Sequence, residues 1–126
     1  MKNNILLIGS FFGFLSILFG AIGSHLLEDQ LFWSQRIDTF ELAVRYQFYH
    51  VFLLLILGLS YDFFEKKYIH YAFYSCVAGI ILFSGSLYTL CLTNISLFGS
   101  ITPIGGLCLM LAWALFSISI FRSLNN

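Results

Sequence analysis

The polar side chains best suited to binding a ligand or to catalysis lie within or beside long apolar stretches of the sequence. Tyr46, Gln47 and His50 fall within one turn of each other, so a helix would present them on one face. Polar groups inside a membrane are costly, and they often mark functional sites. The candidate ligand-binding residues are His25, Tyr46, Gln47, His50, Ser84, Tyr88 and Thr102.

Several kinds of chemistry are compatible with this set. The residues could form a polar network that only holds helices together, or a pocket for a small ligand, a lipid head group or a proton. His25 and His50 could ligate a haem or a metal, but no carboxylate is placed to orient the imidazoles. We therefore assign no metal ligand, and the cofactor stays unknown. No serine is paired with a histidine and an aspartate, so we assign no catalytic residue and expect a non-enzymatic protein.

Four long apolar stretches must position these residues. They cover about residues 5–24, 43–60, 71–93 and 101–121, and the second helix is expected to begin earlier, so that the helices cover about 5–24, 38–60, 71–93 and 101–121. About 20 helical residues cross a hydrocarbon core about 30 Å thick. The chain of 126 residues is 60% hydrophobic and only 10% charged, whereas soluble domains carry about 25% charged residues. The sequence predicts an all-α membrane protein in which residues 1–126 form one antiparallel bundle of four transmembrane helices.

Charge and cysteine content exclude other classes. The formal net charge is zero and the basic residues are scattered, which argues against nucleic-acid binding. Three cysteines without a CxxC motif indicate neither a disulfide framework nor a thiolate metal site. The first apolar run follows a basic start, as in a secretory signal peptide, but it exceeds the usual 7–15 residues and three more runs follow. We expect it to be retained as the first helix.

The basic residues predict the orientation of the chain in the membrane. With four crossings, Arg36 and Arg45 fall on one side. The other four fall on the opposite side: Lys2, Lys66, Lys67 and Arg122. Because basic residues favour the cytoplasmic side, both termini should be cytoplasmic. This threading brings the candidate polar residues toward the outer end of the bundle.

Small residues recur along one face of the first helix. They are Gly9, Gly13, Ser16, Gly20 and Ser24. Small side chains let helix backbones approach closely, which matters because lipid gives helices no hydrophobic reason to associate. We expect this stripe to pack within the bundle, with a dimer contact as the alternative. The expected partners are the lipid bilayer and, in the alternative, a homo-oligomer or a larger membrane complex.

Local motifs predict details of the second and fourth helices. Asp38 and Glu41 have the spacing of a capping box, and Glu41 and Arg45 have that of an ion pair between successive turns. Pro103 suits the first turn of a helix, because the amide hydrogen it lacks is not needed there.

Four motifs, in order along nearly the whole chain, resemble those of one known family. They are Gly20–His25, Tyr46–His50, Leu82–Tyr88 and Ile101–Gly106, and Trp113 also fits. The family consists of small bacterial membrane proteins filed as domain of unknown function 423, whose eukaryotic relatives are called transmembrane protein 256. One departure is Ser24, where the family usually has alanine. The resemblance implies a four-helix bacterial inner-membrane protein and implies no activity.

The leading hypothesis is an uncharacterised, non-enzymatic, multi-pass inner-membrane protein. Its outward-facing polar pocket would take a small ligand, a lipid head group or a partner subunit. The alternatives are a haem- or metal-binding redox protein and an accessory subunit of a larger complex.

Overall fold

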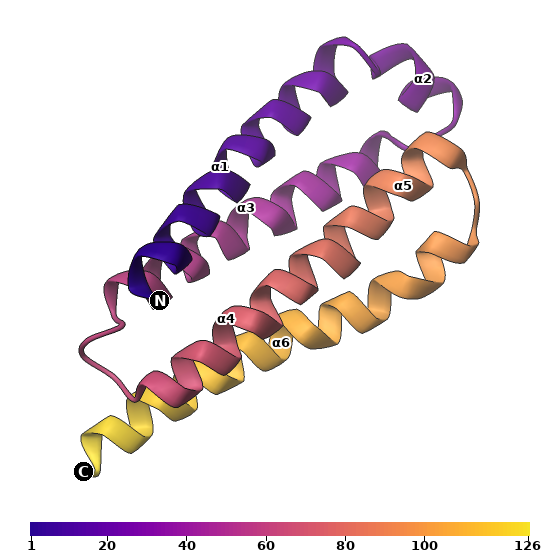
Figure 1. Cartoon of the computed structure of the whole chain (residues 1–126). Helices are drawn as coiled ribbons and strands as arrows, with labels where there is room; N and C mark the ends of the chain where they lie inside the picture. Colours follow the sequence, from indigo (N-terminus) through magenta and orange to yellow (C-terminus); the bar gives the residue numbers. More distant parts are fainter.

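The computed structural model describes all 126 residues as an elongated bundle of helices without strands (Figure 1). In chain order the elements are α1 (Lys2–His25), α2 (Glu28–Trp33), α3 (Ile37–Leu59), α4 (Lys66–Ile80), the π-helical turn η1 (Ile81–Gly85), α5 (Ser86–Thr93) and α6 (Leu97–Leu124). The short helix α2 connects α1 to α3. Because α4, η1 and α5 follow each other without a break, they form one long helical segment.

Four helical segments are long and apolar enough to cross a membrane. They are Lys2–His25, Ile37–Leu59, Lys66–Thr93 and Leu97–Leu124. They alternate in direction, and both chain termini lie at the end of the bundle opposite α2 (Figure 1). The predicted fold class, a four-span helical bundle, is confirmed. We call the end that carries α2 the outer end, because the basic residues favour a cytoplasmic position for the termini.

The spans pack as two antiparallel pairs, α1 with α3 and α4–α5 with α6, and α3 contacts the second pair (Figure 1). Twelve buried residues form the main core: Ile5, Leu53, Leu54, Leu57, Ile69, Ala72, Phe73, Cys76, Ile80, Leu109, Ala112 and Phe116. They come from all four spans. Two smaller clusters lie nearer the outer end, around Phe40 and around Leu87. Most other apolar side chains are exposed, as expected for a surface that faces lipid.

Charged residues form ion pairs at the end of the bundle where the two termini lie. The ammonium of Lys2 lies 2.7 Å from a carboxylate oxygen of Asp62, in the loop between α3 and α4. Lys66 approaches the other oxygen of Asp62 at 4.0 Å. The hydrogen bond from Lys2 holds the pKa of the Asp62 carboxyl below its usual value. Both residues are exposed, so this contact orients the loop more than it stabilises the fold.

Several predicted boundaries and motifs were wrong in detail. The third span begins at Lys66 rather than 71, and the fourth runs from Leu97 to Leu124 rather than from 101 to 121. Helices continue past the hydrocarbon because their backbone bonds do not depend on apolar side chains. Pro103 therefore lies inside α6 and not in its first turn. The predicted capping box at Asp38 is absent, because α3 begins at Ile37 without a side-chain cap.

Helix α6 approaches η1 closely at Gly105. A Cβ atom at this position would overlap the backbone nitrogen of Phe83 and would lie 2.6 Å from the carbonyl carbon of Leu82. The hydroxyls of Ser86 and Thr102 lie 2.7 Å apart at the same crossing. Backbone cannot move aside as a side-chain end can, so this crossing requires glycine at position 105.

Replacing this glycine should loosen the contact between α6 and η1. We expect Gly105→Ala to lower the free energy of unfolding by about 1–3 kcal/mol, the usual cost of overpacking. Gly106→Ala is the matched control, because its Cβ would meet only the Phe83 ring at 3.8 Å. Both variants gain the same helix propensity, so the difference between their free energies of unfolding in detergent measures the clash of the new Cβ atom with the η1 backbone. Equal stability of the two variants would contradict the packing described.

Candidate functional site

Gln47, a predicted ligand-binding residue, is buried and connects three helices. Its side-chain amide donates a hydrogen bond to the carbonyl oxygen of Phe12 on α1, at 3.0 Å. Its side-chain carbonyl accepts one from the hydroxyl of Tyr88 on α5, at 2.8 Å. Both ends of the amide are therefore engaged within the chain. Gln47 joins α1, α3 and α5 in a region where water is not available to replace these bonds.

His50, also buried, uses both ring nitrogens within the chain. Nδ1 lies 2.7 Å from the carbonyl oxygen of Tyr46, and the indole Nε1 of Trp113 donates to Nε2 at 3.2 Å. A carbonyl can only accept, so Nδ1 carries the hydrogen and Nε2 is the acceptor for the indole. The imidazole therefore links α3 to α6 in one defined tautomer. No lone pair is left free to ligate a metal.

His25 lies apart from His50. It is exposed at the end of α1, and its neighbour Gly23 packs against the ring of Phe40 near the start of α3. His50 lies ten residues beyond Phe40, which is about 15 Å along a helix. The two histidines therefore do not converge, and the haem or metal alternative lacks the pair of ligands on which it was based.

The other predicted residues also make contacts between or along helices. The hydroxyl of Ser84 donates to the carbonyl oxygen of Ala43, at 2.7 Å, and Thr102 bonds to Ser86. Tyr46 is partly exposed, with its ring centroid 4.8 Å from that of Phe83. Of the seven predicted residues, only Gln47 and Tyr88 bond to each other through their side chains. Together these contacts join the helices at several levels of the outer half.

The small-residue stripe of α1 packs against α3 in its first half. A Cβ atom at Gly9 would lie 3.2 Å from Leu54, and one at Gly13 would lie 3.3 Å from Val51. Both distances are shorter than usual packing, so the backbones approach closely here. At Gly20 the corresponding distance, to Val44, is an ordinary 3.6 Å. The two helices therefore approach less closely at Gly20 than at Gly9 and Gly13, whereas nearer the outer end the Phe40 ring packs directly against Gly23.

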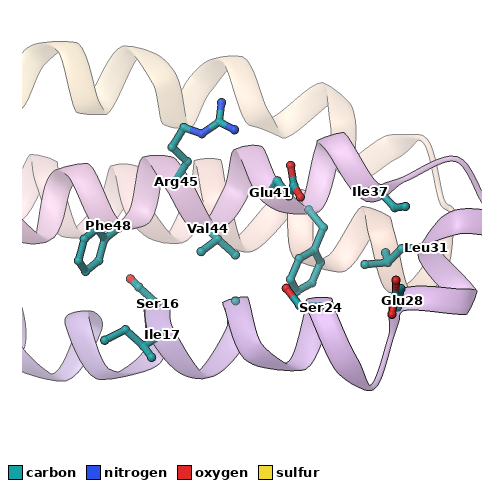
Figure 2. Close-up of a pocket in the computed structure, with 13 residues that line it drawn as sticks. Ser16, Ile17, Ser24, Glu28, Leu31, Ile37, Glu41, Val44, Arg45 and Phe48 are labelled. Carbon is teal, nitrogen blue, oxygen red and sulfur yellow. The ribbon is translucent and has the colours of Figure 1, made fainter.

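A groove of about 570 Å³ lies between the outer halves of α1 and α3 and reaches α2 (Figure 2). Its lining residues are Ser16, Ile17, Gly20, Gly23, Ser24, Glu28, Leu31, Ile37, Phe40, Glu41, Val44, Arg45 and Phe48. Three residues of the stripe, Ser16, Gly20 and Ser24, belong to this lining. None of the seven predicted ligand-binding residues does.

The groove has an apolar part and a charged part. Val44 and Phe48 point from α3 toward α1, whereas Glu41 and Arg45 extend together from another side of α3 (Figure 2). Glu28, on α2, lines the outer end. Glu41 and Arg45 do not form the predicted ion pair. The only ion pairs of the chain are those of Asp62 at the other end of the bundle.

Sequence reasoning missed the groove because it treated small residues only as packing residues. The spacing of Gly20 and Ser24 fits close packing and a hollow equally well. A usable signal was present in α3: Glu41 and Arg45 lie one turn apart within a predicted span, where charged residues usually line cavities.

Fold, apolar surface and internal hydrogen bonding define this chain as a small multi-pass integral membrane protein. The family described as "Protein of unknown function (DUF423)" matches residues 19–106, from the outer part of α1 into α6. This chain belongs to that family.

Its relatives are named as membrane proteins. A UPF0382 membrane protein of Staphylococcus haemolyticus is 37% identical and covers 93% of this chain and 94% of its own length. The UPF0382 membrane protein YwdK of Bacillus subtilis is 31% identical, with coverage of 94% and 97%. The UPF0382 inner membrane protein YgdD of Escherichia coli is 31% identical, with coverage of 94% and 89%. No solved structure matches. The chain is a protein of the bacterial cytoplasmic membrane, as predicted.

Removing the Gln47 side-chain amide should destabilise the bundle. Gln47→Leu loses two bonds between helices, each worth about 0.6 kcal/mol and at most about 1.7 kcal/mol in membrane proteins. Tyr88→Phe loses one of them, so a double-mutant cycle should show positive coupling between positions 47 and 88. Unfolding in a denaturing detergent measures the stability of the unmodified chain, the two single variants and the double variant.

Ser117→Ala is the control, because Ser117 bonds only to Trp113 of its own helix. Its stability should equal that of the unmodified chain. Independent, additive effects of the changes at positions 47 and 88 would contradict the hydrogen bond between them.

Proposed function

We propose that this protein is a non-enzymatic membrane protein that binds an amphiphilic lipid in the groove between α1 and α3. The observation that supports the proposal is the combination, in one groove, of six apolar residues with three charged residues, Glu28, Glu41 and Arg45. An amphiphile combines the same two kinds of group. Lipid surrounds this surface at high concentration, so the ligand needs no separate route of entry.

The dimensions of the groove support a ligand of this kind. Its volume of about 570 Å³ lies within the range of about 300–1,000 Å³ that is typical of small-molecule sites. From Ile17 to Ser24 the groove follows α1 for about 10 Å. This length accommodates part of an acyl chain against Ile17, Val44 and Phe48, while the head group stays near the surface.

The groove chemistry favours binding over catalysis. Its lining contains two serines, but no histidine or cysteine. A serine nucleophile needs an adjacent base, and the serine–histidine arrangement is missing from this lining. The buried histidine, His50, lies elsewhere and is held by Tyr46 and Trp113.

We assign the outward-facing site to this groove and not to the cluster predicted around Gln47 and His50. The hydrogen bonds of that cluster are used to join helices, and a ligand would have to break them. Binding at the groove leaves these bonds intact. The cluster then supports the site indirectly, by fixing α3 against α5 and α6.

Filling the groove should displace its lipid. Gly20→Leu adds a branched side chain beside Val44, whereas Gly20→Ala adds one methyl group at an ordinary contact distance of 3.6 Å. Native mass spectrometry of protein purified in mild detergent should show a retained lipid on the unmodified chain and on Gly20→Ala. Gly20→Leu should lose it at unchanged thermal stability.

The same experiment separates lipid from a protein occupant. If Gly20→Leu keeps the full complement of lipid, the proposal is wrong. If the unmodified chain is a dimer without retained lipid and Gly20→Leu is a monomer, the groove holds a helix of a second copy instead.

A further inference from the structure

Three charged side chains at the groove have no ionic partner within the chain. They are Glu28 on α2 and Glu41 and Arg45 on α3, and all are exposed. Only the ion pairs around Asp62 are formed, at the opposite end of the bundle. One positive and two negative side chains at the edge of the groove are therefore free to contact an occupant.

Arg45 is placed where an unpaired charge is costly. It lies eight residues after Ile37, the first residue of α3, which is about 12 Å along the helix. Because α3 is only slightly longer than the hydrocarbon core, the backbone at Arg45 lies within the apolar layer. Its long side chain can extend toward the surface, where lipid phosphates lie. Arginine binds phosphate through two parallel hydrogen bonds, which would compensate its charge.

Glu41 lies about 6 Å nearer the surface than Arg45 on the same side of α3 (Figure 2). With Glu28, it gives the outer part of the groove two carboxylates. A purely anionic head group would be repelled by them, whereas an ammonium group beyond the phosphate would be attracted. A primary ammonium also donates hydrogen bonds to carboxylates, which a quaternary choline cannot do.

We propose that the groove binds an aminophospholipid, a membrane lipid whose head group carries both a phosphate and a primary amine. The phosphate contacts Arg45, the ammonium contacts Glu41 and Glu28, and one acyl chain lies against Ile17, Val44 and Phe48. This inference rests on the proposed lipid-binding function and names the lipid class. Along α3, Phe48 lies deepest, Arg45 follows and Glu41 lies nearest the surface, which is the order of acyl chain, phosphate and amine in the lipid.

The test is competition among lipids with matched acyl chains. Delipidated protein in detergent is mixed with equimolar phosphatidylethanolamine, phosphatidylcholine and phosphatidylglycerol, and native mass spectrometry counts the bound species. We expect phosphatidylethanolamine to bind about tenfold more tightly than either competitor, the factor that one charge-assisted hydrogen bond supplies.

Two charge-removing variants assign the contacts. The double variant Glu28→Gln with Glu41→Gln should abolish the preference for phosphatidylethanolamine over phosphatidylcholine while overall phospholipid binding persists. Arg45→Gln should weaken binding of all three lipids, because all three contain phosphate. Lys67→Gln is the control, since Lys67 is exposed at the opposite end of the bundle, and it should leave the three affinities unchanged.

The outcomes distinguish the two proposals. If Gly20→Leu blocks lipid binding but the three lipids bind equally well, the groove is a lipid site and the aminophospholipid inference is wrong. If phosphatidylglycerol binds most tightly, the assignment of the carboxylates to an ammonium is likewise wrong. If Gly20→Leu changes the binding of no lipid, the proposed function itself fails.

Discussion

The structure depends on one constraint: the hydrocarbon interior supplies no water to hydrogen-bond with polar groups. Gln47 and His50 lie at this depth, and each can be buried only because partners from other helices meet it. Phe12 and Tyr88 engage Gln47, and Trp113 engages His50. These bonds are individually modest, but each requires a particular helix at a particular height. They therefore fix the arrangement of helices more than they add to stability.

The two sides of α3 consequently have different roles. The side that carries Gln47 and His50 faces the other helices and has its polar groups engaged. The side that carries Val44 and Phe48 faces α1 across a groove, and Glu41 and Arg45 beside it have no partner in the chain (Figure 2). Close packing at Gly9 and Gly105 holds the neighbouring helices in place. The groove is thus a part of the surface of α1 and α3 that no other helix covers, in a bundle whose helices are otherwise held by close contacts and hydrogen bonds.

Sequence reasoning could predict the architecture because each span is apolar over its whole length, and this signal needs no knowledge of neighbours. It also identified polar residues that the bundle cannot leave unpaired. It could not tell that Gln47 and His50 were satisfied internally, since Phe12 contributes a backbone carbonyl and Trp113 lies 63 residues from His50. Nor could it separate packing from a hollow along the stripe. Gly13 and Gly20 are the same residue type and each faces a valine, and only the distance of a Cβ atom to that valine, 3.3 Å at Val51 and 3.6 Å at Val44, distinguishes their surroundings.

If lipid binds between α1 and α3, the interior around Gln47 and His50 stays closed to it. Photo-crosslinking with a phospholipid that carries a diazirine on its acyl chain distinguishes the two places, with labelled residues mapped by mass spectrometry. We expect saturable labelling at Ile17, Val44 and Phe48 that excess unlabelled lipid suppresses. Labelling at Met110 on the exposed face of α6 should be non-saturable. Saturable labelling at Gln47 or His50, or equal competition at Ile17 and Met110, would contradict this expectation.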